Sequence, residues 1–222
     1  MNVGIVCEGS TDFAVLRVVC GALLGTRDLT VTLLQPRFDA LAGRAGGTPG
    51  PGWQGVRAFL QQMGPRLAAA AQDILVVHVD ADIRHRPEIR KHLGVSEADD
   101  ELSPLCDHVK GWMTGGVPES VVIVLPREAT EAWLCAVASH RANVEGIAKP
   151  ADELHRAGVL GARGGAADKR AAEYEALAAR LAPILRDPRE LAKVPELARF
   201  AGKVAARAKA VRRAARTGGG RA

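Results

Sequence analysis

The sequence is poor in aromatic residues, and this scarcity excludes one class of nucleic-acid-binding protein. Phenylalanine, tryptophan and tyrosine make up only 4% of the 222 residues, too few for a chain that stacks successive bases on aromatic side chains. The chain also lacks a run of about 20 apolar residues, the length that spans a bilayer. Its first residues reach Glu8 too soon for a signal peptide. We therefore expect a cytoplasmic protein with no membrane partner.

Cysteine is also scarce, which argues against a disulfide framework. The four cysteines form no CxxC pair and show no spacing typical of metal ligands. We expect reduced and mostly buried thiols. Hydrophobic residues, in contrast, make up 47% of the chain, enough for a buried core and too many for a disordered protein.

Positive charge is concentrated at the C-terminus. The net charge is +5, but eight basic residues and no acidic residue follow Glu196, whereas the remaining chain holds 22 basic and 25 acidic residues. A basic tail of this kind is typical of a protein that binds a polyanion. A solvated helix rich in alanine and arginine is an equally good interpretation of the same residues. For a nucleic-acid partner, the expected contacts are Arg84, Arg199, Lys203, Arg207, Arg212 and Arg213.

Apolar runs alternate with helical patterns over the first 140 residues. Strands are predicted at 3–7, 29–34, 74–79 and 121–125, and helices at 13–24, 53–71 (interrupted at Gly64-Pro65) and 127–138. This alternation predicts an α/β fold with a mainly parallel sheet flanked by helices. Beyond residue 140 only helices are predicted, at 152–157, 169–185 and 195–216. We therefore divide the chain into an α/β domain, 1–140, and a helical C-terminal region, 141–222, that ends in the basic tail.

Acidic residues follow three of the four predicted strands. Glu8 follows the first strand, Asp80 and Asp82 the third, and Glu128 and Glu131 the fourth. Parallel strands end at one edge of a sheet, where open α/β folds build their sites. Two residues apart, Asp80 and Asp82 point to the same side if strand geometry continues, and Glu128 and Glu131 share a helix face.

Carboxylates gathered in this way need a counter-charge, because like charges at close range raise one another's pKa values. A divalent cation supplies it, and carboxylate oxygens are ligands that Mg²⁺ or Mn²⁺ prefers. Taken alone, an Asp-x-Asp pair at a strand end more often caps a turn. The coincidence of three acidic segments favours a metal site. His78, inside a predicted strand, is interpreted as a core histidine.

Three segments resemble a known family. Residues 5–12 (IVCEGSTD) are similar to the opening motif of Toprim domains, and residues 77–82 (VHVDAD) resemble their DxD strand. Residues 125–134 (LPREATEAWL) resemble a segment of stand-alone Toprim-like proteins, the DUF4276 and RloB-like groups, which are related to OLD-type nucleases. The resemblance covers about residues 3–138.

The resemblance implies a Rossmann-like Toprim fold and metal-dependent phosphodiester chemistry. Glu8 would be the general acid or base, Asp80 and Asp82 would hold the ion, and Glu131, with Glu128, would complete the site. The expected activity is a nuclease acting on DNA or RNA, and a role in phage defence is common in such groups. One alternative is a non-hydrolytic module that binds a nucleotide or nucleic acid and acts with a protein partner. Another is a nucleic-acid-binding tail on an inactive scaffold.

Overall fold

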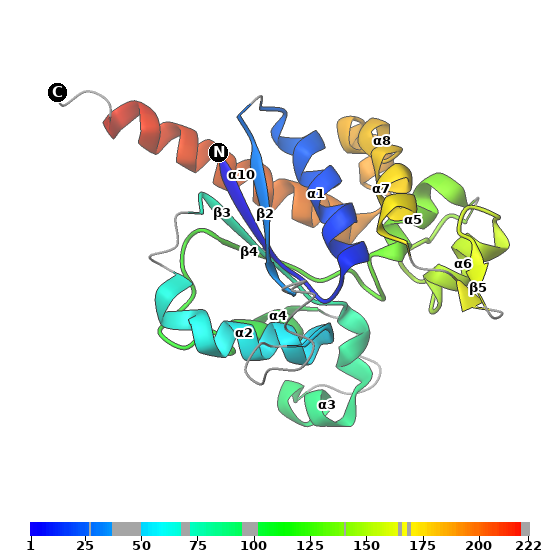
Figure 1. Ribbon diagram of the computed structural model, residues 1–222, viewed down its shortest axis with the longest axis horizontal. Helices are drawn as coiled ribbons and strands as arrows, with labels where there is room; N and C mark the ends of the chain where they lie inside the picture. Colours follow the sequence, from blue (N-terminus) through cyan, green and yellow to red (C-terminus); the bar gives the residue numbers. More distant parts are fainter. Residues whose placement is uncertain are drawn as a thin grey trace.

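The structure is a computed structural model with four parallel strands at its centre. It describes residues 1–26, 28–36, 50–67, 72–94, 102–139, 141–163, 166–167 and 170–218. The strands are β1 (Asn2–Val6), β2 (Thr30–Gln35), β3 (Ile74–His78) and β4 (Val121–Val124), in the order β2-β1-β3-β4. Every pair in this sheet is parallel (Figure 1). The predicted α/β class and parallel sheet are confirmed, and the Toprim identity of the fold stays a prediction.

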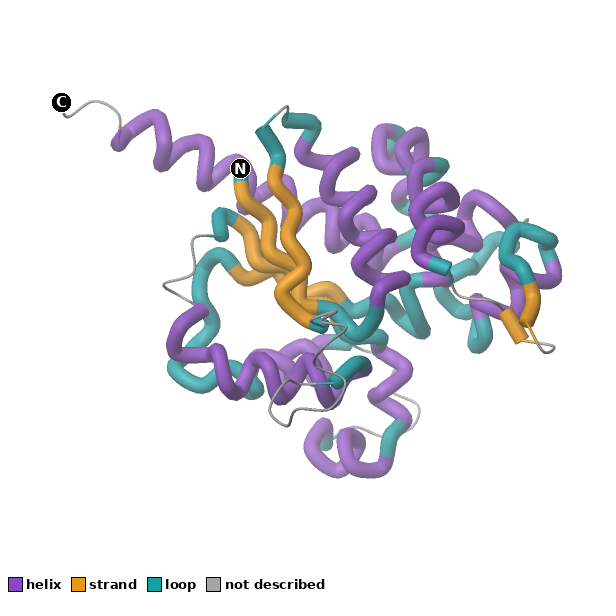
Figure 2. The backbone as a smooth tube through the Cα atoms, in the orientation of Figure 1, coloured by secondary structure: helices purple, strands orange, loops and turns teal. Residues whose placement is uncertain are grey.

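Helices cover both faces of the sheet, as Figure 2 shows. Successive side chains of a strand point to opposite faces, so β3 contributes Val76 to one hydrophobic cluster and Val77 to the other. The first cluster joins the sheet to α1 (Ser10–Leu24), α5 (Glu131–Ala138), α7 (Ala171–Ala179) and α10 (Pro195–Gly218). The second joins it to α2 (Gly52–Leu67), α3 (Pro87–Leu93) and α4 (Ser103–Lys110).

Two local expectations are corrected by the structure. α2 continues through Gly64 and Pro65 to Leu67, although Pro65 has no amide hydrogen to donate to the carbonyl of Gln61. The Thr114 hydroxyl donates to that carbonyl instead (3.3 Å). The predicted end of the helix at residue 71 lies outside the described residues. A short antiparallel pair, β5 (Ala162–Arg163) with β6 (Ala166–Ala167), follows residue 140, although its alanine-rich sequence has no strand signal. The remaining elements are η1, a 3-10 helix (Ala81–His85), and helices α6 (Pro150–Arg156), α8 (Ala182–Arg186) and α9 (Pro188–Leu191).

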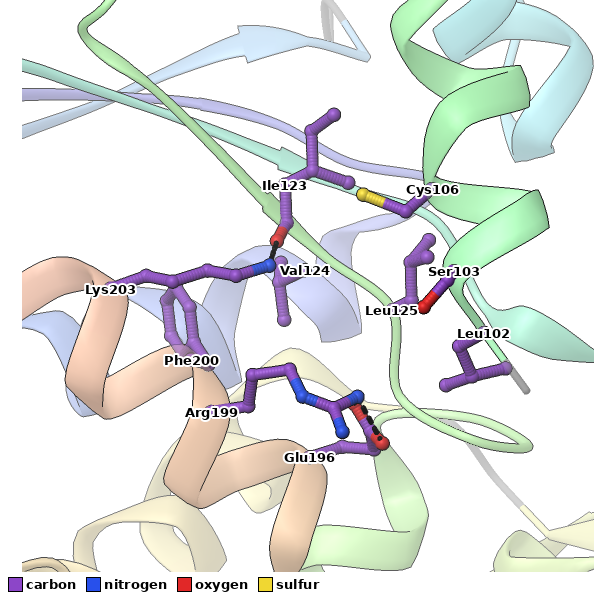
Figure 3. Close-up of a pocket in the computed structure, with 10 residues that line it drawn as sticks. All are labelled: Leu102, Ser103, Cys106, Ile123, Val124, Leu125, Glu196, Arg199, Phe200 and Lys203. Atoms are coloured by element: carbon purple, nitrogen blue, oxygen red, sulfur yellow. Dashed lines mark hydrogen bonds and ion pairs between the residues drawn. The ribbon is translucent and has the colours of Figure 1, made fainter. Parts of the chain in front are cut away.

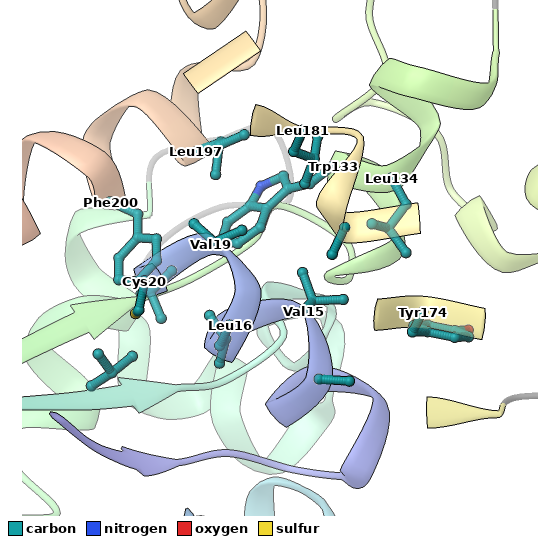
Figure 4. Packing of buried hydrophobic residues seen from close by; sticks show 14 of the residues in the cluster. Val15, Leu16, Val19, Cys20, Trp133, Leu134, Tyr174, Leu181, Leu197 and Phe200 are labelled. Atoms are coloured by element: carbon teal, nitrogen blue, oxygen red, sulfur yellow. The ribbon is translucent and has the colours of Figure 1, made fainter. Parts of the chain in front are cut away.

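The C-terminal helices pack into the same core as the sheet. Figure 4 shows Trp133 of α5 beside Phe200 of α10, with ring centroids 5.9 Å apart. The Trp133 Nε1–H donates to buried Glu145 (3.0 Å), whose carboxylate also accepts the amide of Glu196 in the first turn of α10. This contact fixes the start of α10. One hydrophobic cluster thus spans the predicted boundary at residue 140, and the division itself stays a prediction.

Within the parts of the chain that the structure describes, no helix is both long enough and apolar enough to cross a membrane.

Candidate metal centre

Several ionisable side chains meet at the carboxyl edge of the sheet. Glu8 follows β1, His78 ends β3 and Asp80 comes two residues later. Asp12 lies in the first turn of α1, and Glu131 begins α5 just after β4. These residues come from three connections. They meet because β1, β3 and β4 are neighbours in the sheet and, being parallel, end at the same edge.

Asp12, His78 and Asp80 form a group that could hold a metal ion. Each offers one ligand atom, and these atoms all lie within 4.8 Å of one another. His78 is fully buried and Asp12 is 7% exposed, whereas the Asp80 side chain is 20% exposed. The group is therefore accessible to solvent mainly through Asp80.

Thr130 connects all three members of this group. Its hydroxyl donates to Asp12 Oδ1 (2.9 Å) and lies 2.9 Å from His78 Nε2, and its amide donates to Asp80 Oδ1 (3.2 Å). The hydroxyl is fully buried with the rest of Thr130. Since a hydroxyl both donates and accepts, Thr130 can orient a carboxylate and an imidazole at once.

Glu8 adjoins the group through the backbone of Asp80. The Asp80 amide donates to Glu8 Oε1 (2.8 Å). Burial, reinforced by the negative charge of Asp80, raises the pKa of Glu8 to about 8. A carboxyl group that titrates near neutral pH is suited to give or take a proton during a reaction.

Charges within the group alter one another's protonation. Burial raises the pKa of Asp80 to about 6, although the hydrogen bond from His78 opposes the rise. Burial lowers the pKa of His78, but the carboxylates of Asp12 and Asp80 more than compensate and raise it to about 9. At neutral pH a positive imidazolium therefore supplies part of the counter-charge that the carboxylates require.

Glu131 and Tyr174 form the wall of the group on the α7 side. The Tyr174 hydroxyl donates to Glu131 Oε1 (2.8 Å), and both side chains are buried. Burial and the negative charge of Glu131 raise the pKa of Tyr174. Glu131 also contributes to the raised pKa of Asp80, which places its charge in the same neighbourhood.

Asp82 and Glu128 lie in different surroundings. The extended geometry that would align Asp82 with Asp80 does not continue, because η1 begins at Ala81. Asp82 as a whole residue is exposed. Its carboxyl group is nevertheless partly shielded from water, which raises its pKa, and the charge of Arg86 opposes that rise. Arg84 binds Glu128 (2.6 Å) and the carbonyl of Arg127. Neither carboxylate belongs to the Asp12–His78–Asp80 group, and their predicted metal roles stay predictions.

A glycine-rich turn brings the start of α2 against Glu8. The Gly52 amide donates to the Glu8 carbonyl (2.9 Å), and Gly52 adopts φ of 80°, a conformation that favours glycine. A Cβ on Gly55 would lie 1.5 Å from the Gly50 carbonyl oxygen. The spacing of Gly50, Gly52 and Gly55 is thus a sequence signal for a turn beside the site.

The basic residues of α10 extend away from this group. Lys203 donates to the Ile123 carbonyl in the middle of β4, and Arg199 binds Glu196 within α10. Further along the helix, Arg207 donates to the carbonyl of Asp73 and binds Glu119, and Arg212 donates to the carbonyl of Leu24. Asp73 and Glu119 precede strands, whereas Glu8 and Asp80 follow them. The last half of α10 therefore lies at the edge of the sheet where the strands begin, opposite the carboxyl edge. Arg213 on this half of the helix is exposed.

Sequence reasoning missed Asp12, Thr130 and Tyr174, and it interpreted His78 only as a core residue. Asp12 is the last residue of the IVCEGSTD segment, so its position in that motif was an available signal. His78 is buried as predicted, yet its Nε2 faces Asp80 (3.2 Å), and its Nδ1 has no hydrogen-bond partner among the described residues. Thr130 and Tyr174 carry no pattern that marks them.

Comparisons with protein-family models, with curated proteins and with solved structures found no match.

Proposed function

We propose that this chain hydrolyses phosphodiester bonds with the help of a divalent cation, as a nuclease acting on DNA or RNA. The observation that supports it best is the Asp12–His78–Asp80 group beside Glu8 at the carboxyl edge of a parallel sheet. Three ligand-competent side chains within 4.8 Å of one another fit one metal ion. Glu8, which titrates near neutral pH, adds a proton donor or acceptor next to them.

The donor set suits Mn²⁺ better than Mg²⁺. Imidazole is a good ligand for transition metals, whereas Mg²⁺ prefers oxygen ligands and retains its waters. A bound divalent ion would polarise the phosphoryl oxygen and lower the pKa of water at the site. Asp12 and Asp80 would hold the ion through their carboxylates, and His78 would do so after losing its proton.

Glu8 is proposed as the general acid or base. In the metal-free protein its pKa is near 8, so the side chain is mostly protonated at neutral pH before an ion binds. A carboxyl group that exchanges its proton in this range can give one to a departing oxygen. The Asp80 amide holds Glu8 Oε1 at 2.8 Å, which fixes the direction of the carboxyl group. Thr130 keeps Asp12 and His78 in place.

The test is a cleavage assay on duplex DNA, single-stranded DNA, RNA and cyclic dinucleotides with Mn²⁺ or Mg²⁺. We expect the wild type to cleave at least one substrate only when a divalent ion is added, and Asp80→Asn to be inactive while unfolding at a similar temperature. Cleavage that persists in Asp80→Asn would contradict the proposal. Absence of turnover on every substrate would favour the alternative below.

A non-hydrolytic binding module acting with a partner is the second candidate. One observation favours it: His78 already supplies a positive charge inside the group, so the carboxylates are partly compensated without an ion. This alternative predicts that nucleotides or oligonucleotides bind without turnover. Equilibrium binding with product analysis on the same samples distinguishes the two candidates.

A further inference from the structure

A groove runs along the free edge of β4. The strand pairs with β3 on one side, and within the described ranges no strand pairs with its other side. α4 packs on one face of the sheet and α10 on the other, and two neighbouring cavities of about 210 Å³ and 490 Å³ lie along the edge between them. Cys106, Ile123 and Lys203 line both cavities, and Figure 3 shows the first of them.

The backbone of β4 is available along this groove. The amides of Leu75 and Val79 donate to the carbonyls of Ser120 and Val124, respectively. Ser120 and Val124 therefore direct their backbone groups toward β3. Because backbone groups alternate along a strand, Ile123 directs its own amide and carbonyl to the opposite side, into the groove. The Ile123 carbonyl accepts a hydrogen bond from Lys203 Nζ (3.0 Å), as seen in Figure 3.

The groove carries an excess of positive charge. Its basic lining residues are Lys110, Arg199, Lys203 and Arg207, and its acidic ones are Glu119 and Glu196. Both acids are already paired with arginines of α10, at 2.7 Å for Glu196 and 3.1 Å for Glu119. Lys110 is paired with Asp107, just outside the cavities (2.6 Å), so the excess charge of the groove is that of Lys203. The Lys203 ammonium, in contrast, contacts a neutral carbonyl and can turn to a carboxylate without breaking an ion pair.

We propose that this groove binds an extended peptide with acidic side chains, which adds to β4 as a fifth strand. Strand addition takes its affinity from backbone hydrogen bonds and its specificity from side-chain pockets. The backbone groups of Ile123 and the two cavities offer these features here. Lys203 releases the Ile123 carbonyl to the peptide backbone and pairs with a peptide carboxylate. A lysine that covers the edge of a strand, as Lys203 of α10 does here, also discourages indiscriminate pairing, so peptides without acidic residues bind less well. The proposal is independent of the metal centre.

Cys106 is a built-in reporter for the groove. It lines both cavities and is partly exposed, whereas Cys7, Cys20 and Cys135 are buried. The experiment measures the rate at which iodoacetamide alkylates Cys106, by intact mass, in the full chain. The peptide probe is a capped octapeptide that alternates valine with glutamate. Its controls replace glutamate with serine or lysine, or methylate alternate backbone amides; further arms contain oligo(dT) or inorganic phosphate.

The glutamate peptide should slow alkylation, whereas its N-methylated and lysine forms should have little effect. Lys203→Met should weaken the glutamate peptide about threefold to fivefold, the size expected for a half-exposed ion pair, without weakening the serine peptide. Lys209→Met, an exposed lysine of the same helix outside both cavities, should change neither.

Three results would overturn the proposal. Equal protection by the N-methylated peptide would show that no strand is added. Stronger protection by oligo(dT) or phosphate would assign the groove to nucleic acid or to a small anion. No protection by any probe would show that the edge of β4 is not a binding surface.

Discussion

At the scale of single residues, the candidate centre is defined by shared hydrogen bonds rather than by a row of independent acids. Thr130 contacts Asp12, His78 and Asp80 at distances of 2.9 to 3.2 Å. Burying such a set without an ion is costly unless its members share charge and protons. The raised pKa values of Glu8, Asp80 and His78 are the consequence of that burial and of the charges within the group.

These pKa values predict how the metal-free protein responds to pH. Folding raises them from 4.5, 3.8 and 6.5 to about 8, 6 and 9 for Glu8, Asp80 and His78. A group with a raised pKa binds its proton more tightly in the folded state, so its stabilising contribution is full below the unfolded pKa and is lost as the pH rises through the folded pKa. The free energy of unfolding without metal should therefore fall between about pH 4, near the unfolded pKa of Asp80, and about pH 9, the folded pKa of His78.

Urea unfolding at several pH values, with EDTA present, measures this dependence. Glu8→Gln removes one of the three groups and should make the decline shallower, chiefly below pH 8, where Glu8 exchanges its proton. Added Mn²⁺ should restore stability at the alkaline end, because metal binding competes with protons. Stability that rises with pH in EDTA, with Glu8→Gln no different from wild type, would show that these pKa values are wrong.

At the scale of secondary-structure elements, close backbone contacts fix the helices that cover the sheet. Gly64 in α2 faces the segment after α4: a Cβ on it would lie 2.6 Å from the Thr114 carbonyl oxygen and 2.8 Å from the Thr114 amide nitrogen. Gly21 in α1 is a matched contrast, since a Cβ there meets nothing within 4 Å. The same substitution should therefore have opposite effects at the two positions.

Gly64→Ala should lower the free energy of unfolding by about 1–3 kcal/mol, because rigid backbone atoms must move to admit the methyl group. Gly21→Ala should raise it by about 0.5–1 kcal/mol, the usual gain from alanine in a helix interior. Chemical denaturation of both variants at one pH provides the measurement. A neutral Gly64→Ala would mean that the contact between α2 and Thr114 is looser than these distances indicate.

At the scale of the whole molecule, the candidate centre and the basic half of α10 occupy opposite edges of the sheet. Arg207 and Arg212 hold α10 against carbonyls of Asp73 and Leu24. The end of the helix extends past the body of the protein (Figure 1). Lys209, Arg213 and Arg216 are exposed on this half of α10. Any nucleic acid held by these exposed residues would have to extend along the protein to reach Glu8 and Asp80.

Replacing Lys209, Arg213 and Arg216 with alanine together should weaken nucleic-acid binding without unfolding the protein. For every phosphate group that the variant no longer binds, the slope of log affinity against log salt should become shallower by about 0.9 for duplex DNA or about 0.7 for single strands. Mn²⁺ binding should be unchanged in this triple variant. Fluorescence anisotropy over a salt series tests the prediction, and an unaltered slope would show that this end of α10 does not bind phosphates.

The sequence allowed the strands to be predicted well and the site only in part. Short β-branched runs such as Val121–Val124 predicted the strands because few other structures suit them. The carboxyl edge was predicted because all strands of a parallel sheet end at the same edge. The contacts of Asp12 and Thr130 could not be predicted, since they depend on how α1 and the β4–α5 connection meet. Likewise Asp82 differs from Asp80 because a 3-10 helix, not a strand, follows His78.

The most direct test of the metal centre is a Mn²⁺ titration by calorimetry at pH 8 on the wild type, Asp12→Asn and Asp82→Asn. We predict one ion per chain for the wild type, an affinity at least about tenfold lower for Asp12→Asn, and no change for Asp82→Asn; tenfold is the lower end of what even residues that only support a ligand contribute. Unfolding temperatures without metal would confirm that the variants are folded. Loss of binding in Asp82→Asn with Asp12→Asn unaffected, or no binding by the wild type, would contradict the assignment of the centre to Asp12, His78 and Asp80.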